Sequence, residues 1–165
     1  MTFKTPDLCD EFETELGKTV RVVAPMFKRY GGRASFSGEI VTLKIFEDNS
    51  LVREAFAEEG KGKVLVIDGG GSMRCALVGD QLAILAHKNG WEGVVVYGCI
   101  RDSADINEID IGFRALNTHP QKSIKKGVGD RNIAVTFGGT TFNPNEWLYA
   151  DEDGILLSTN ALLPS

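Results

Sequence analysis

The chain has 165 residues, of which 42% are hydrophobic and 25% charged, and this composition is that of a globular domain with a real core. Its formal net charge of −5 argues against general nucleic-acid binding, which needs clustered Lys and Arg. Cys9, Cys75 and Cys99 are odd in number and widely spaced, so they predict neither a disulfide framework nor a CxxC metal site. No signal peptide or membrane-length apolar run is visible, so we expect one cytoplasmic domain over residues 1–165, without a membrane partner.

Apolar periodicity and the residues at segment ends predict alternating helices and strands. In chain order these are a helix over 5–16, a strand over 38–46, a helix over 49–59, a strand over 63–68, a helix over 80–89, a strand over 93–97, and short strands near 134–137 and 154–158. Thr5 before Pro6 predicts the cap of the first helix, and Asn49 or Ser50 the cap of the second. No repeat or linker divides the chain, so the pattern favours a single, turn-rich α/β domain.

Strand 63–68, helix 80–89 and strand 93–97 form a predicted βαβ unit. The two strands of such a unit are parallel, so their carboxyl ends lie at the same edge of the sheet. The segments 69–79 and 98–102 both leave from that edge, where open α/β sheets usually bind ligands. Residues about 22 apart in sequence, Gly79 and Arg101, are therefore expected to face one small pocket.

The residue types at this edge suit a small anion and a metal ion. Arg101 is a permanent cation with a planar fork of donors for a carboxylate, and Asp102 is a hard oxygen ligand for Mg²⁺ or a similar ion. The backbone N–H groups at the helix start, Gly79, Asp80, Gln81 and Leu82, can bind an anion. Together they match a 2-oxo acid whose keto oxygen is polarised by the metal.

Other interpretations of these residues stay open. An Arg-Asp dipeptide is usually a solvated surface pair or a helix cap, and Asp102 could cap a helix that begins near Ser103. Asp80 is favoured in any first helical turn. The DGGGS sequence at 68–72 fits neither nucleotide-binding glycine pattern and indicates a tight turn, and the acidic run 151–153 indicates a turn between strands more than a metal site.

Several blocks of the sequence, in one order, carry a family resemblance. These are GGRASFSGEIVTLKIFEDN (31–49), VLVIDGGGSMRCALVGDQLA (64–83), GWEGVVVYGCIRD (90–102), VTFGGTTF (135–142) and YADEDGI (149–155). The chain resembles the RraA-like family, which includes the regulator of ribonuclease activity A and the 4-hydroxy-4-methyl-2-oxoglutarate aldolases. The resemblance extends from about residue 5 to residue 158.

The resemblance implies a swivelling β/β/α-type domain, with the βαβ unit as its core, assembled as a ring-shaped homotrimer. In the aldolases of the family the site is GDxL followed, after a spacer, by RD, which is similar to Gly79–Leu82 and Arg101-Asp102 here. By that resemblance Gly79, Asp80, Gln81, Leu82 and Arg101 hold the pyruvyl part of the substrate, and Asp102 holds a divalent Mg or Mn ion. The implied activities are cleavage of 4-hydroxy-4-methyl-2-oxoglutarate to pyruvate and decarboxylation of oxaloacetate, both through a pyruvate enolate.

The resemblance also implies an alternative role. The short length and the GGRASF and FEDN blocks are similar to the ribonuclease regulators, which bind ribonuclease E or its degradosome scaffold and inhibit it without chemistry. In the best-known branch of regulators the metal-site Asp is replaced, whereas this sequence keeps Asp102, which favours retained catalysis. The chain ends at Ser165, so an acidic group that longer aldolases bring from a neighbouring subunit is in doubt here.

Overall fold

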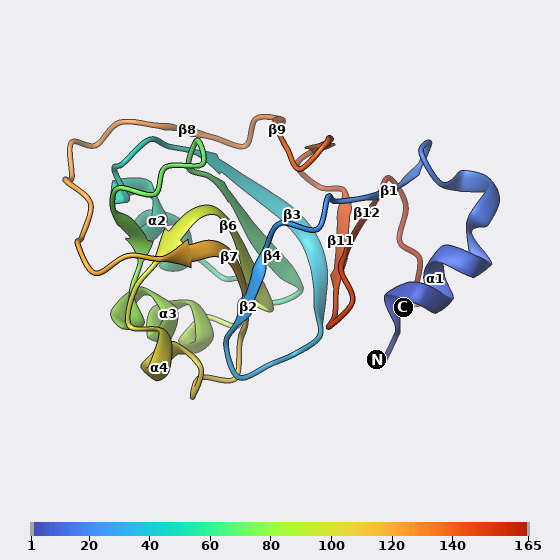
Figure 1. Cartoon of the computed structure of the whole chain (residues 1–165), viewed down its shortest axis with the longest axis horizontal. Helices are drawn as coiled ribbons and strands as arrows, with labels where there is room; N and C mark the ends of the chain where they lie inside the picture. Colours follow the sequence, from blue (N-terminus) through green and yellow to red (C-terminus); the bar gives the residue numbers. More distant parts are fainter. Residues whose placement is uncertain (1, 165) are drawn as a thin grey trace.

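A curved mixed sheet forms the centre of the computed structural model, which describes residues 2–164 (Figure 1). Its ten strands run in the order β1-β12-β11-β3-β4-β6-β7-β2, with β5 beside β6 and β8 beside β3, while β9 and β10 form a separate hairpin. The strands are β1 (Val20–Val22), β2 (Lys28–Tyr30), β3 (Phe36–Lys44), β4 (Lys63–Asp68), β5 (Ala76–Val78), β6 (Gly93–Ile100), β7 (Gly112–Thr118), β8 (Asp130–Arg131), β9 (Val135–Phe137), β10 (Thr140–Phe142), β11 (Trp147–Ala150) and β12 (Ile155–Ser158). The helices are α1 (Thr5–Glu11), α2 (Ser50–Phe56), α3 (Asp80–Lys88) and α4 (Ser103–Ile106), with a 3₁₀ turn η1 (Glu13–Glu15) after α1.

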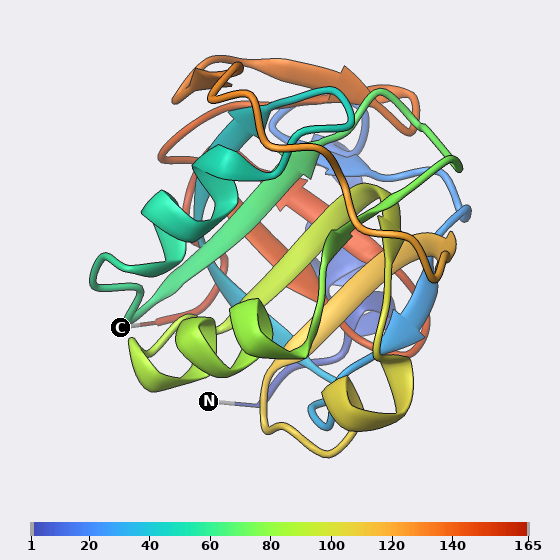
Figure 2. The same cartoon turned by 90° about the vertical axis from the view of Figure 1, so that its left-hand side faces the viewer.

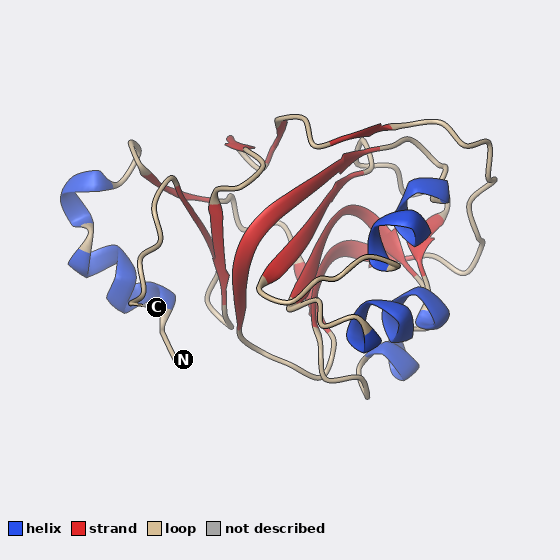
Figure 3. Ribbon diagram, turned by 180° about the vertical axis from the view of Figure 1, so that it is seen from behind, coloured by secondary structure: helices blue, strands red, loops and turns tan. Residues whose placement is uncertain are grey.

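Strands β3, β4, β6 and β7 are parallel neighbours, and the connections between them contain α2, α3 and α4. These three helices gather on one side of the sheet, whereas α1 lies at the far end of the molecule beside both termini (Figure 3). Viewed from the helix side, the parallel strands pass side by side behind α2 and α3 (Figure 2). The sheet is therefore covered by helices on one face, and its parallel strands end at one common edge.

Both faces of the central strands are buried, because β4 and β6 alternate between two apolar cores. Leu65, Ile67, Val94 and Val96 pack toward the helices, while Val64, Val66 and Val95 pack toward the β9–β10 hairpin, β11 and β12. This two-sided burial explains why both strands are continuous apolar runs in the sequence. Within residues 2–164, no helix has the length and the apolar character needed to cross a membrane.

The expected α/β class and the βαβ core are confirmed, and several boundaries were wrong. The first helix ends at Glu11 instead of residue 16, β3 occupies Phe36–Lys44 instead of 38–46, α2 ends at Phe56, and β6 continues to Ile100 instead of stopping at residue 97. Segment 69–79 was expected as a loop, but it contains β5, which pairs with the end of β6. The strands that the sequence did not predict are β1, β2, β5, β7, β8, β10 and β11.

The predicted cap of the first helix was wrong, and that of the second was right in position only, since Asn49 is the N-cap residue of α2. Thr5 is the first residue of α1, and its backbone N–H and hydroxyl both bond the carboxylate of Asp151. At α2 neither Asn49 nor Ser50 supplies the capping side chain, because Asp48 Oδ1 accepts the Ser50 N–H at 2.9 Å. The acidic run 151–153 is the predicted turn between two strands, since Asp151 Oδ1 accepts the backbone N–H of Asp153 and Gly154.

Phe36 packs where two neighbouring parallel strands both carry glycine. Gly93 of β6 faces Gly112 of β7, and a Cβ at either position would overlap the Phe36 ring. Arg114 lies 5.1 Å from the centre of the same ring and donates to the carbonyls of Ala34, Phe113 and Asp151. Burial, with Arg29 close by, lowers the pKa of Arg114 to about 10, so the guanidinium stays charged at neutral pH. This cluster fixes the turn before β3 onto β6 and β7.

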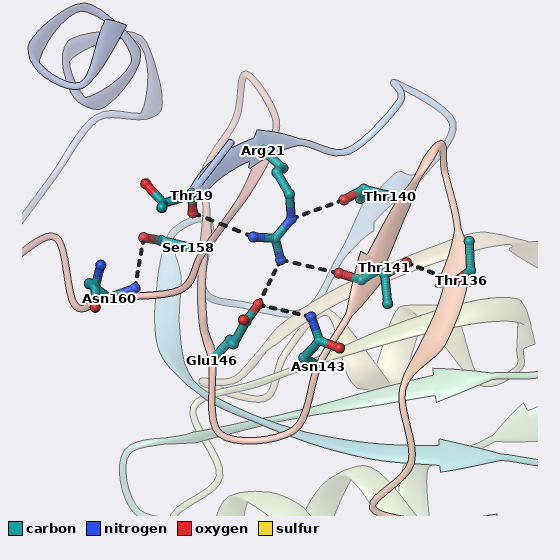
Figure 4. A network of polar contacts seen from close by, with 9 residues as sticks. All are labelled: Thr19, Arg21, Thr136, Thr140, Thr141, Asn143, Glu146, Ser158 and Asn160. Carbon is teal, nitrogen blue, oxygen red and sulfur yellow. Dashed lines mark hydrogen bonds and ion pairs between the residues drawn. The ribbon is translucent and has the colours of Figure 1, made fainter. Parts of the chain in front are cut away.

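A second polar cluster attaches the β9–β10 hairpin to the outer strands (Figure 4). Arg21 of β1 donates to Thr140 Oγ1 at 3.2 Å, to the Thr141 carbonyl at 3.2 Å and to Glu146 Oε1 at 2.7 Å. Both side chains of the Arg21–Glu146 pair are only 19% exposed, so solvent screens this ion pair weakly.

Replacing Arg21 with Met is expected to lower the free energy of unfolding by about 2 kcal/mol, because Glu146 loses its ion-pair partner and two hairpin acceptors lose the Arg21 donor. The matched control is Arg74→Met, which removes an ion pair of the same 2.7 Å N–O distance whose Arg is 69% exposed. That control should lose less than about 1 kcal/mol. Urea denaturation followed by circular dichroism measures both, and equal losses would contradict the assignment.

Candidate functional site

The end of β6 and the start of α3 meet at the carboxyl edge of the sheet. The Arg101 N–H donates to the Val78 carbonyl at 2.9 Å, which places Arg101 beside the residue that precedes Gly79. The Asp80 N–H donates to Asp102 Oδ2 at 3.0 Å. The sequence prediction that the two segments face each other is therefore met by direct hydrogen bonds between them.

Asp102 has a backbone conformation that few residues adopt. Its φ of 58° and ψ of 39° lie in the left-handed region, which Asp and Asn tolerate better than most side chains. It occupies the N-cap position of α4, but its side chain makes no capping bond there and turns to Asp80 instead. Asp102 therefore holds the cap position of a helix that begins at Ser103, as the alternative interpretation expected, but its side chain does not act as the cap.

Gly79 leaves the space that this arrangement needs. A Cβ at position 79 would lie 2.8 Å from Asp102 Oδ2 and 3.5 Å from Cγ and Nε of Arg101. A Cβ there would displace the Asp102 carboxylate from the helix start, whereas its contact with Arg101 would be of ordinary van der Waals length. The φ of Gly79 is −117°, so the glycine is needed for this close approach and not for backbone freedom.

The first turn of α3 presents N–H groups that the helix itself does not use. The first helical bond runs from the Ala83 N–H to the Gly79 carbonyl, so the amides of Asp80, Gln81 and Leu82 have no helical acceptor. Asp102 accepts the first of them, which leaves those of Gln81 and Leu82 for a ligand anion. The Leu82 side chain is 6% exposed and packs in the core, so only its backbone can take part.

Arg101 is half-buried and keeps most of its donors free. Its Nη1 donates to the Pro120 carbonyl at 3.4 Å, and no ion pair involves it within residues 2–164. An unpaired guanidinium is a strong local attraction for a carboxylate, even though the whole chain carries a net charge of −5.

The residues present fit a weakly held divalent cation. In the part of the chain that the structure describes, no group of three His, Cys, Asp or Glu side chains could surround a metal. Asp102 is an exposed carboxylate that uses only Oδ2 in the bond to Asp80, so a lone pair is available to a cation. Mg²⁺ commonly binds through one or two carboxylates and completes its shell with waters and substrate oxygens. Asp102 can therefore supply the protein ligand of such a site.

The sequence analysis missed the residues that support this edge from behind. Asp48 and Asn49 are each less than a tenth exposed: Asp48 bonds to segment 119–129, and Asn49 bonds to that segment and to β5. The only sign of them in the sequence was the polar run EDN at 47–49, directly after the strand expected over 38–46. Such a run indicates a turn, and it does not reveal that Asp48 is buried. A cavity of about 440 Å³ lies elsewhere, between residues 22–27 and 151–155.

Comparison with known proteins decides the family. The model of the RraA-like family, described as Aldolase/RraA, matches residues 5–157. The chain belongs to this family. A relative from Dechloromonas aromatica, named "Putative 4-hydroxy-4-methyl-2-oxoglutarate aldolase", is 85% identical over 98% of this chain and 99% of its own. A relative of the same name from Alkalilimnicola ehrlichii is 60% identical over 99% of each chain.

Two solved structures of the family share the fold over nearly their whole length. The RNA-processing inhibitor RraA from Thermus thermophilis superposes with a TM-score of 0.92 at 44% identity, covering 100% of this chain and 96% of that one. A protein from Geobacillus kaustophilus, described as an S-adenosylmethionine:2-dimethylmenaquinone methyltransferase, has a TM-score of 0.92 at 46% identity and 97% coverage of both chains. The names of these relatives state three different functions: an aldolase, an RNA-processing inhibitor and a methyltransferase. The family alone therefore does not decide among them, and the geometry around Arg101 is needed.

Replacing Gly79 with Ala should displace the Asp102 carboxylate and free the Asp80 N–H, because the new Cβ would lie 2.8 Å from Oδ2. The expected result is faster hydrogen exchange of the Asp80 amide, measured by NMR. Gly154→Ala is the control, since a Cβ there meets nothing within 4 Å. An Asp80 amide that exchanges at the same rate in both variants would show that the carboxylate does not depend on this space.

Proposed function

We propose that this RraA-like protein is a divalent-metal-dependent lyase that cleaves 4-hydroxy-4-methyl-2-oxoglutarate to two pyruvates and decarboxylates oxaloacetate. One observation carries the proposal: the Arg101 guanidinium, which forms no ion pair in residues 2–164, and the exposed Asp102 carboxylate both lie beside the start of α3, where the Gln81 and Leu82 amides have no helical acceptor. The aldolase name of relatives at 85% and 60% identity supports it.

The pyruvyl unit common to both substrates fits the three groups. Its carboxylate is held by the Arg101 guanidinium and by the backbone amides of Gln81 and Leu82. The guanidinium is a cation beside the start of α3, and the amides carry the partial positive charge of the helix N-terminus. Its keto oxygen faces the side of Asp102, which would hold a Mg²⁺ or Mn²⁺ ion. A bound divalent cation supplies Lewis-acid stabilisation of negative charge on that oxygen.

The reaction breaks one carbon–carbon bond next to the pyruvyl unit. In aldol cleavage the 4-hydroxyl loses its proton, the C3–C4 bond breaks, and C4 becomes the carbonyl of one pyruvate. The bonding electrons pass to C3 and the keto group, giving an enolate that takes up a proton to form the second pyruvate. In oxaloacetate the C3–C4 bond also breaks: the C4 carboxylate leaves as CO₂, and the bonding electrons pass to C3 and the keto group to give the same enolate, which then takes up a proton. Arg101 keeps the carboxylate in place, so the breaking bond is held in one orientation.

Asp102→Asn is expected to lower kcat for oxaloacetate about a hundredfold or more, because the amide keeps the shape but loses the charge that attracts a cation. The assay is pyruvate release with Mg²⁺ or Mn²⁺, corrected for the metal-only rate, and EDTA should abolish the wild-type activity. Asn also tolerates the left-handed backbone of position 102, so the change tests charge and not folding.

Arg101→Met should raise KM and lower kcat together, with kcat/KM falling about a hundredfold, since the carboxylate loses its bidentate partner. The matched control for both variants is Asp105→Asn, an exposed carboxylate on the same short helix that begins after Asp102. Wild-type rates in all three variants would refute the assignment of the site.

The homotrimer is also part of the proposal. Its support is the exposed position of Asp102 beside Arg101, which a neighbouring subunit would cover to exclude water, and the family to which the chain belongs. Size-exclusion chromatography with light scattering should give three times the 17.9 kDa mass of the chain.

A regulatory role is the second candidate, supported by the 44% identity to an RNA-processing inhibitor. An acidic protein with a net charge of −5 could dock on basic segments of a ribonuclease E scaffold without direct contact to nucleic acid. Such binding should weaken as salt rises and be unchanged in Asp102→Asn, as measured in a pull-down with purified scaffold. If Asp102→Asn does not bind the scaffold, docking involves the residues around Asp102. If the wild-type protein does not bind at low salt, the regulatory role is refuted.

A further inference from the structure

Segment 119–129 connects β7 to β8 and borders the Arg101 site without regular structure of its own. The Pro120 carbonyl accepts the bond from Arg101 Nη1 at 3.4 Å, and the Gln121 carbonyl accepts the Ala76 N–H of β5 at 2.8 Å. Farther along, the segment is mostly exposed, with Ile124 67% and Val128 65% accessible. It crosses the edge of the sheet as the long connection to β8 in Figure 1. Its position therefore depends on contacts with other parts of the chain.

Asp48 supplies two of these contacts. Its carboxylate is 3% exposed, and its Oδ2 accepts the backbone N–H groups of Lys126 at 2.8 Å and Val128 at 3.0 Å. The other oxygen accepts the N–H and the hydroxyl of Ser50 at the start of α2. Burial alone would raise the pKa of Asp48, but these bonds from Ser50, Val128 and Lys126 outweigh it and lower the pKa well below its usual range. The carboxylate is thus charged and fully used at neutral pH.

The residues on either side of Asp48 reinforce the same connection. The Asn49 N–H donates to Ser123 Oγ at 3.2 Å, and Asn49 Nδ2 donates to the Leu77 carbonyl of β5 at 2.9 Å. The Glu47 carbonyl accepts the Ile124 N–H at 3.3 Å. One turn between β3 and α2 therefore holds both β5 and segment 119–129, and Arg101 bonds to each of these two elements.

We propose that Asp48 is a positioning residue of the Arg101 site, which holds segment 119–129 so that the Pro120 carbonyl orients the Arg101 guanidinium. The proposal rests on the lyase function proposed above. Asp48 touches no substrate, and it holds the segment through the backbone amides of Lys126 and Val128. A guanidinium bonded on one side to a fixed carbonyl presents its remaining donors in one direction, whereas a loose segment would let it rotate.

Asp151 provides a matched control for the test. It is 6% exposed and, like Asp48, accepts four hydrogen bonds: from the Thr5 N–H and hydroxyl and from the N–H groups of Asp153 and Gly154. It holds α1, which lies at the opposite end of the molecule from segment 119–129 (Figure 1). Asp48→Ala and Asp151→Ala therefore remove comparable polar contacts at different distances from Arg101.

The experiment compares the two variants with the wild type by thermal unfolding, by trypsin cleavage and by oxaloacetate kinetics with Mn²⁺. Both variants should unfold at lower temperature. Only Asp48→Ala should be cut faster by trypsin at Lys125 and Lys126. Its kcat/KM should fall about tenfold or more below that of Asp151→Ala, mainly because KM rises. If Asp48→Ala does not fold, the isosteric Asp48→Asn takes its place, since the amide retains one acceptor for the segment or the helix.

Two outcomes would overturn the positioning role: equal losses of kcat/KM in the Asp48 and Asp151 variants, or a faster-cleaved segment with wild-type kinetics. A wild-type protein that releases no pyruvate above the metal-only rate would instead refute the proposed lyase function, and the positioning role with it. Failure of the positioning role shows only in the variants, whereas failure of the lyase function shows already in the wild type, so the two are distinguished.

Discussion

Arg101 donates its backbone N–H to the Val78 carbonyl at 2.9 Å, in the last contact between β5 and the end of β6. Strand β4 pairs with the first part of β6, and β5 takes over the pairing at Cys99 and Ile100 after the chain has turned through the glycines that follow Asp68. This second pairing brings the start of α3 against the end of β6. Without it the two segments would share an edge of the sheet but not a common site.

The sequence predicted the parts of the fold that depend on strong local patterns. Two apolar runs separated by a helix indicated the βαβ core, and the parallel strands of such a unit require Gly79 and Arg101 to lie at one edge. Strand β5 was missed because three apolar residues between polar turns look like part of a loop. In β7 the apolar run is interrupted by Arg114, whose charge is buried against backbone carbonyls.

The orientation of the candidate site could not be predicted from residue types. The left-handed backbone of Asp102 results from the passage between β6 and α4, and it decides that the carboxylate meets Asp80. The contribution of Asp48 was hidden for another reason: its partners lie 78 and 80 residues further along the chain, and they are backbone amides, which any residue could supply. Long-range bonds to the backbone leave little trace in the partner's sequence.

The packing of Phe36 on Gly93 and Gly112 has an evolutionary consequence. The ring occupies the volume that two side chains would otherwise fill, so the three positions share one space. In a related sequence, Ala at 93 or 112 should be accompanied by a smaller residue at 36, and Phe at 36 should always occur with both glycines. Substitutions at positions 36, 93 and 112 are therefore expected to occur together during evolution. Where all three differ in a relative, the turn before β3 should pack differently on β6 and β7.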